Sequence, residues 1–262
     1  MQLIRCRWFA LALCGLLGAH AHAQNQNEPR QAQTRQLLDW LGFTQLLEQS
    51  PLALEASIEA EAGFRNATAA QQAAWRRELQ PRLRPQQLQQ DLLNYVLERY
   101  RPENFQHVEA LLQGALAKRV RYFDLAMTQP GAPRTLVALR ASEQGEPAPV
   151  RRALLQEIDA AASTSQMVAV LHTGVTERVR RTAGAAPSDE AALLAEVAER
   201  QRFLAPLTTD YALYAYRFLR DDELVAYRDL LRDPELQWLL DVSRQGLAAV
   251  LRGDLRPPDS PR

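Results

Sequence analysis

Residues 233–251 read DPELQWLLDVSRQGLAAVL. The pair Asp233-Pro234 is a helix start signal, because an aspartate side chain can accept the free N–H groups of a first turn. Proline fits the first helical position, where its missing N–H matters least. Strong helix formers such as Leu, Ala, Gln and Glu are frequent in the residues that follow. We therefore expect a helix from Pro234 to Leu251.

The same composition extends through the chain. Ala, Leu, Gln, Glu and Arg are frequent, whereas only 11 of the 262 residues are glycine. Apolar side chains recur at intervals of three and four residues, which is the spacing of an amphipathic helix. The sequence therefore predicts an all-α fold, a multi-helix bundle. Further helices are expected at 34–50 with a bend at Gly42, and at 52–64, 69–79, 86–100, 102–113, 115–127, 151–181, from 188, 209–219 and 222–231.

Clusters of proline and glycine divide the chain. They lie at 129–133 and 145–149, and such clusters mark turns and loops. We expect a first helical bundle at 34–128, a linker at 129–149 and a second helical bundle at 150–252. Residues 134–140 within the linker fit either a short strand or a helical turn. The proline-rich end, 253–262, is expected to be a disordered tail.

The two expected bundles show a weak internal repeat. A shift of 119 residues superposes Asp91, Tyr95, Arg101, Leu111 and Leu112 on Asp210, Tyr214, Arg220, Leu230 and Leu231. An internal duplication explains these matches, and so does the chance alignment of two amphipathic helix pairs in phase. Both explanations stay open. The duplication predicts two related helical bundles.

The first residues have the pattern of a secretory signal peptide. Arg5 and Arg7 precede an apolar run from Trp8 to Ala19, and the small residues Ala21 and Ala23 form a cleavage site before Gln24. We expect a signal peptide at 1–23, cleaved between Ala23 and Gln24, and a flexible start at 24–33. Export to the periplasm follows, with secretion from the cell as the alternative.

Cleavage at this site changes the chemistry of the chain. Both cysteines, Cys6 and Cys14, lie before the cut, so the mature chain is expected to be cysteine-free. A lipoprotein is disfavoured because Leu13 precedes Cys14, where a lipidated cysteine normally follows Gly or Ala. The apolar run is too short to cross a bilayer, and no transmembrane span is expected in the mature chain. Loss of Arg5 and Arg7 leaves 29 of 31 basic residues against 31 acidic ones, a formal charge of −2, which does not favour nucleic acid as a partner.

Residues 222–237 read DELVAYRDLLRDPELQ. They resemble the core motif of a family of exported Gram-negative proteins of unknown function, in which an acidic-Leu pair begins a helix and Ser-Pro-x-Gly begins the next. Asp233 stands where the family has Ser, and Leu236 where it has Gly. The resemblance covers about residues 205–251 and implies an all-helical exported domain without catalytic residues. The matched positions are Glu223, Leu224, Tyr227, Leu230, Leu231, Asp233 and Pro234.

The motifs of common enzyme sites are missing from the sequence. It contains no G-x-G-x-x-G, no phosphate-binding loop and no H-E-x-x-H. Glu103 and His107 are spaced as a helical pair with Glu109 nearby, which indicates a solvated ion pair more strongly than a metal site. We expect no catalytic residues, no cofactor and no metal.

Aromatic residues suggest a binding site instead. Tyr211, Tyr214 and Phe218 share one face of a helix, and with Tyr227 and Trp238 they form a candidate aromatic groove for a protein, peptide or envelope ligand. The core stripe of a helix gives the same pattern. The sequence favours a non-catalytic binding or interaction module. The alternatives are a cell-envelope hydrolase with a glutamate acid and a periplasmic chaperone or assembly helper, and the oligomeric state stays open.

Overall fold

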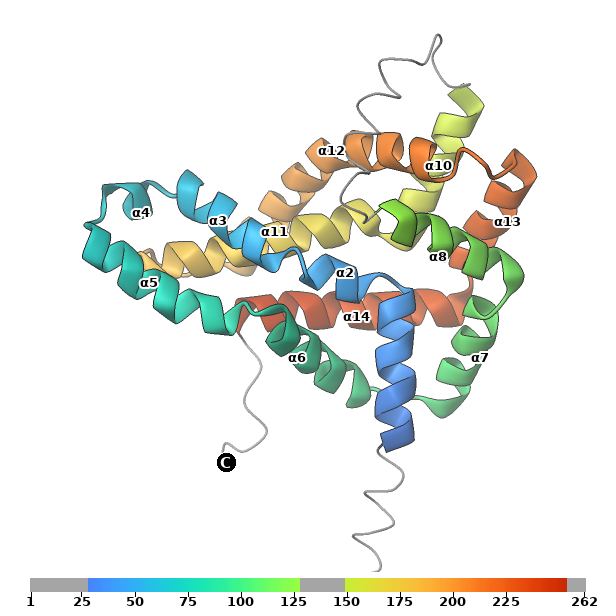
Figure 1. The fold of residues 1–262 in the computed structure, drawn as a ribbon, viewed down its shortest axis with the longest axis horizontal. Helices are drawn as coiled ribbons and strands as arrows, with labels where there is room; N and C mark the ends of the chain where they lie inside the picture. The colour runs from blue at the N-terminus through green and yellow to red at the C-terminus, as the bar shows by residue number, and fades with distance from the viewer. Residues whose placement is uncertain (1–27, 128–148, 254–262) are drawn as a thin grey trace, which may run out of the picture.

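The computed structural model describes residues 28–127 and 149–253, and every regular element in these two ranges is an α-helix. The expected all-α, multi-helix fold is confirmed. The described chain begins with a helix over residues 28–40. The helices that follow (Figure 1) are α2 (Phe43–Leu47), α3 (Ser50–Ala60), α4 (Ala62–Asn66), α5 (Ala69–Arg82), α6 (Pro85–Leu97), α7 (Pro102–Leu112), α8 (Ala115–Met127), α10 (Pro149–Ala162), α11 (Thr164–Thr182), α12 (Glu190–Ala215), α13 (Asp221–Leu231) and α14 (Pro234–Arg252).

Helix α14 runs through the middle of the arrangement in Figure 1. Its start is the one the sequence predicts, because Pro234 lies in the first turn and Asp233 Oδ1 accepts the N–H groups of residues 235 and 236 at 3.0 and 3.1 Å. The helix ends at Arg252, one residue beyond the expected end. Gly253 follows with a φ of 76°, a left-handed conformation that a residue without a Cβ adopts easily.

One side of α14 forms the centre of the hydrophobic core. It packs against α6, α7 and α11. The core to which it belongs extends from the helix over 28–40 to the C-terminal end of α14. Its buried residues on α14 are Leu236, Leu239, Leu240, Val242, Ser243, Gly246, Leu247, Val250 and Leu251.

Two glycines allow α14 to approach its neighbours closely. A Cβ atom placed on Gly174 of α11 would lie 2.6 Å from the Cβ of Leu251. A Cβ atom placed on Gly246 of α14 would lie 2.6 Å from Cδ1 of Tyr95 in α6. Carbon atoms in a packed interior do not come this close, so a larger residue at either position must displace its neighbours.

Arginines of α11 hold the C-terminal end of α14. The guanidinium of Arg178 donates to the carbonyl oxygens of Val250 and Leu251, and Arg181 Nη1 donates to the carbonyl of Arg252 at 3.3 Å. The last carbonyls of a helix have no partners within the helix and carry partial negative charge. The basic cluster at 178–181 therefore joins two helices.

The expected division into two bundles, 34–128 and 150–252, is wrong. Helix α3 from the first range packs along α11 from the second, and α6 packs along α14. A hydrogen bond of 2.9 Å joins Ser57 Oγ and Thr176 Oγ1 across the same boundary. The two halves bury their apolar sides against each other in one shared core. The internal duplication is not confirmed.

The expected flexible start at 24–33 is wrong for residues 28–33, which are helical. Gln33 accepts a hydrogen bond from the hydroxyl of Tyr100 at 2.6 Å and donates one to Glu109 Oε2, also at 2.6 Å. The polar composition suggested flexibility, but two partners more than 60 residues away hold this turn of helix.

Two helix boundaries also differ from expectation. The helix expected at 151–181 breaks at Ser163, whose φ is 56°, and becomes α10 and α11. The helices expected from 188 and at 209–219 are one helix, α12, which begins at an Asp189 cap and runs on through Pro206. Thr208 and Thr209 hydroxyls donate to the carbonyl of Ala205 beside the proline. Packing along α10 and α11 thus outweighs the local cost of a proline within the helix.

Several predictions fall outside the described residues. These are the signal peptide at 1–23 with its Ala23-Gln24 cleavage site, both cysteines, the segment 134–140 and the tail from 254. In the ranges that the structure does describe, no helix is both long and apolar enough to cross a bilayer core.

We predict that Gly174→Ala destabilises the protein by about 1–3 kcal/mol, because the new Cβ must push α11 and α14 apart. Gly63→Ala is the matched control, since its Cβ would lie 3.4 Å from the Cβ of Ala183, an ordinary contact distance. Urea denaturation of the two variants measures the difference. Equal free energies of unfolding for Gly174→Ala and the parent protein would contradict the close approach.

Candidate functional site: an aromatic surface on α8 and α12

Helix α12 exposes large apolar side chains on the side turned away from the core. Phe203, Leu207 and Tyr211 follow one another at four-residue intervals and are 71%, 48% and 36% exposed. Four residues span about 6 Å along a helix, so the three side chains form a row. Buried Thr209 lies on the opposite side of α12. Ala215 continues the four-residue spacing beyond Tyr211, but it is buried at the end of the helix, where the exposed row stops.

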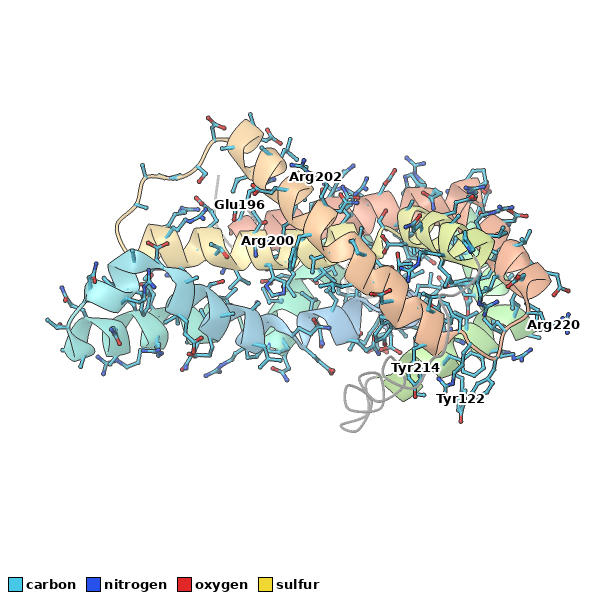
Figure 2. The ribbon with its side chains drawn as sticks, turned by 90° about the horizontal axis from the view of Figure 1, so that it is seen from above. Tyr122, Glu196, Arg200, Arg202, Tyr214 and Arg220 are labelled. Atoms are coloured by element: carbon cyan, nitrogen blue, oxygen red, sulfur yellow. The ribbon has the colours of Figure 1, made fainter. Side chains whose placement is uncertain are left out.

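Helix α8 and the turn after α12 extend this row. Tyr122 is 69% exposed and Phe218 is 61% exposed. The ring of Phe123 connects them, with centroid distances of 5.9 Å to Tyr122 and 6.4 Å to Phe218. Figure 2 shows Tyr122 and Tyr214 at the same end of the molecule. We call the following residues the aromatic surface: Tyr122, Phe123, Leu125, Phe203, Leu207, Tyr211 and Phe218, together with Arg217.

Arg217 brings a positive charge to the aromatic surface. Its guanidinium lies over the rings of Tyr214 and Phe218, 4.0 and 4.4 Å from their centroids. It also donates a hydrogen bond of 2.8 Å to the carbonyl of Tyr214. No carboxylate of the described ranges pairs with it, and the cation is therefore available to an acidic group from outside.

A tyrosine–aspartate pair lies beneath the aromatic surface. The hydroxyl of buried Tyr216 donates to Asp124 Oδ1 at 2.8 Å and thereby joins the end of α12 to α8. The ring of Tyr227 from α13 packs edge-on against Tyr216 at 6.2 Å. Burial raises the pKa of Asp124 to about 6, although the hydrogen bond from Tyr216 opposes the change. Burial also raises the pKa of Tyr211 and of Tyr227, so both hydroxyls keep their protons.

The five residues of the expected aromatic groove do not gather at one place. Tyr211 and Phe218 belong to the aromatic surface, Tyr214 borders it under Arg217, and Tyr227 lies in the layer below. Trp238 packs elsewhere, at the beginning of α7. The centroid of its ring is 6.3 Å from that of Phe105, and the guanidinium of Arg101 lies over the ring, 4.6 Å from its centroid.

The sequence reasoning missed five apolar contributors from α8 and α12, namely Tyr122, Phe123, Leu125, Phe203 and Leu207, and it also missed Arg217 in the turn after α12. The row on α12 had a readable signal, because Phe203 and Leu207 precede Tyr211 at helical spacing. The row crosses Pro206, where the sequence predicts two separate helices and the structure has one. Nothing in the sequence pattern could show that α8 lies beside α12.

The matched motif residues have structural contacts. Asp233 caps α14, as described above, with Pro234 in its first turn. Glu223 accepts the N–H of Arg220 at 2.9 Å and a hydrogen bond from Arg119 at 2.6 Å, which ties the start of α13 to α8. Leu224 and Leu231 are buried, and Leu230 is packed against the core. These contacts make a helix corner and bring no chemistry with them.

His107 has a different partner from the one expected. Its Nε2 lies 3.0 Å from Asp233 Oδ2 and 3.8 Å from Glu235 Oε2. The three side chains could offer ligand atoms to a metal ion, since these atoms lie within 4.8 Å of one another. However, Asp233 already caps α14, whose N-terminal end carries partial positive charge that disfavours a cation. The geometry fits an ion pair between α7 and the corner before α14.

Glu55 and Glu61, two glutamates that could supply the acid of a hydrolase, have basic partners. Glu55 pairs with Arg76 at 3.6 Å, and Glu61 lies 3.8 Å from Arg180. Glu177 is the buried glutamate of the described ranges, and it accepts both the N–H and the hydroxyl of Ser188, at 2.9 and 2.8 Å. A glutamate fully engaged in this way holds a loop in place and is poorly suited to act as a general acid.

No protein-family model, no curated protein and no solved structure matches this chain. The resemblance of residues 222–237 to an exported family therefore stays a prediction. Function has to be inferred from the geometry of the aromatic surface and of the remaining molecule.

We predict that Asp124→Asn removes a pH dependence of stability. Because the pKa of Asp124 is raised to about 6 in the folded chain, the folded state holds this proton more tightly than the unfolded state. Stability must then fall as pH rises from about 4 to about 6 and stay lower above it. Asparagine still accepts from Tyr216 but does not ionise, so the variant should gain about 1–3 kcal/mol over the parent between pH 4 and 7.

Urea denaturation at pH 4 and pH 7 measures this effect, with Glu199→Gln on the exposed part of α12 as the control. Parallel pH profiles for Asp124→Asn and the parent protein would show that Asp124 ionises without constraint.

The pKa values of the two histidines in the described ranges should be shifted in opposite directions. The hydrogen bond that His107 donates to Asp233 raises the pKa of His107, whereas burial and then the charge of Arg200 lower the pKa of His172. The stabilising pair at His107 is thus fully present below pH 6.5 and is lost as pH rises through the raised pKa. NMR titration of the imidazoles checks both values, and Asp233→Asn should bring His107 back toward its ordinary pKa. A His107 pKa unaffected by that change would refute the pairing.

Proposed function

We propose that this protein is a non-catalytic binding protein whose aromatic surface docks a helix of a partner protein. The observation that carries the proposal is the concentration of exposed apolar side chains. Six of the ten large apolar residues that are exposed in the described ranges belong to the aromatic surface, on α8, α12 and the turn after α12. Contiguous exposed apolar surface of this kind marks interaction sites in folded proteins.

The shape of the surface favours a macromolecular partner over a small ligand. Phe203, Leu207 and Tyr211 lie on the outer side of one helix, and a cleft between the helix over 28–40, α2 and α6 lies away from them. Small ligands are usually enclosed in a concave site, whereas rows of side chains on a helix pack against a second helix. Aromatic residues and arginine are also the residue types that dominate binding energy in protein interfaces.

The chemistry of the surface describes the partner. A row at four-residue spacing fits a partner helix with apolar side chains at three- and four-residue intervals. Arg217 lies at one end of the row without a carboxylate of its own. We therefore expect the partner helix to carry an acidic residue beside its apolar side, close to Arg217, where it would form a charge-assisted hydrogen bond.

The expected compartment of this function is the periplasm. The supporting features are the signal peptide pattern of residues 1–23 and the resemblance of residues 222–237 to an exported family. A chaperone or assembly helper is the second candidate, because an exposed apolar surface would also serve a protein that shields unfolded chains. The two differ in selectivity: a specific binding protein recognises one partner, whereas a chaperone protects many unrelated chains.

Site-specific photocrosslinking in living cells tests the proposal. A photoreactive phenylalanine analogue at Phe203 should give one discrete crosslinked species, while the same analogue at Leu52 on α3, which is 75% exposed, should give none. Phe203→Glu should abolish a crosslink formed from Tyr122, yet change the free energy of unfolding by no more than about 0.5 kcal/mol because the position is exposed.

The alternative outcomes are distinct. A ladder of many products from Phe203, with suppressed aggregation of unrelated proteins, would favour the chaperone. Equal crosslinking from Phe203 and Leu52, or none from either, would argue against any role of the aromatic surface.

A further inference from the structure

A cleft of about 540 Å³ lies between the helix over residues 28–40, α2 and α6. This volume is typical of sites for small ligands. The cleft shares no residue with the aromatic surface. Its lining residues are Ala32, Arg35, Gln36, Leu38, Asp39, Phe43, Thr44, Leu47, Gln86, Gln89, Gln90, Leu92 and Leu93.

The floor of the cleft is apolar. It is formed by buried residues of the core, Leu38, Phe43, Leu47, Leu92 and Leu93. An aliphatic side chain of a ligand that binds on this floor is removed from water, and its transfer is favourable by about 25 cal/mol per Å² of apolar area buried.

The walls of the cleft carry polar groups of complementary kinds. Arg35, Gln36 and Asp39 line one wall from a single helix, and three glutamines of α6 line the other. The side chains of Arg35, Gln36 and Gln86 make no hydrogen bond or ion pair with other residues of the described ranges. Gln90 Nε2 donates to Asn94 at 2.9 Å, which leaves its carbonyl oxygen as a free acceptor.

Arg35 and Asp39 place opposite charges one helical turn apart, about 6 Å along the axis. Asp39 accepts only a long hydrogen bond of 3.3 Å on Oδ1, from Gln45. The cation can therefore bind a carboxylate while the anion binds an ammonium group. Two extended residues of peptide span about 7 Å, which brings the two ends of a dipeptide within reach of both side chains.

We propose that this cleft binds short peptides of two or three residues through their free termini. Arg35 holds the terminal carboxylate, Asp39 holds the terminal ammonium, and the glutamine amides donate to and accept from the peptide bonds. An apolar side chain of the peptide rests on the leucine floor. A phosphate ligand fits less well because Asp39 repels it, and a lipid would strip water from the charges without replacing it.

Isothermal titration calorimetry of the full chain with the dipeptide Ala-Leu tests this. We expect saturable binding that Arg35→Gln and Asp39→Asn each weaken by about tenfold, the effect of one charge-assisted hydrogen bond. N-acetyl-Ala-Leu and Ala-Leu amide should each lose a comparable factor. Arg77→Gln, at an exposed arginine of α5, is the matched control and should bind Ala-Leu like the parent protein.

Three results would overturn the proposal: no heat of binding with millimolar Ala-Leu, equal affinity for the doubly blocked peptide, or unchanged affinity in Arg35→Gln. Circular dichroism of each variant shows whether it is folded, and Gln86→Ala at the exposed opposite wall gives a second variant with the same expected direction. Phe203→Glu should leave this binding intact, so the cleft and the aromatic surface can fail separately.

Discussion

The closeness of α14 to α11 and α6 is the constraint on which the rest of the structure depends. At Gly174 and Gly246 the helices approach within a distance that leaves no room for a Cβ atom. This contact fixes the central helix against one helix from each half of the described chain, and the arginine bonds at its C-terminal end add to the same junction. With that junction formed, the apolar sides of the two halves face one core. Neither half could then close over its own core as a separate bundle.

Local chemistry explains which parts of this fold could be predicted from sequence. The helix starts at Pro102 and Pro234 and the break at Gly114 are properties of a few adjacent residues, and the structure has them where the sequence placed them. Ser163 and Pro206 gave misleading signals, because the first breaks a helix that its neighbours would continue and the second lies within a helix that packing preserves. The helix propensity of a single residue contributes at most about 3 kcal/mol to the free energy of a helix, and the packing of that helix against its neighbours can contribute more.

Local sequence patterns also could not predict how the residues of the candidate site come together from distant parts of the chain. Helical spacing predicts that Tyr211, Tyr214 and Phe218 share one face of a helix, but α12 ends at Ala215 and Phe218 lies in the turn after it. The spacing also could not tell which side of α12 the other helices cover. Asp124 is 92 residues away from Tyr216, and only the packing of α8 against α12 brings them together. Trp238 is aromatic and close in sequence to these tyrosines, but neither property determines which helices it contacts. It belongs instead to the contact between α7 and α14.

The use of arginine connects the fold to both candidate sites. The near-zero net charge gave no indication of a charged partner, yet a balanced total still permits local excess. Arg178 and Arg181 donate to carbonyls of α14, Arg178 also donates to the carbonyl of Arg82 in α5, and Arg180 pairs with Glu196 at 2.8 Å. By contrast Arg217 and Arg35 lie against exposed rings and an open cleft, without ion pairs in the described ranges. A single unpaired guanidinium beside an apolar surface can bind one carboxylate at a defined position. A broad basic patch binds negative charge without fixing that position.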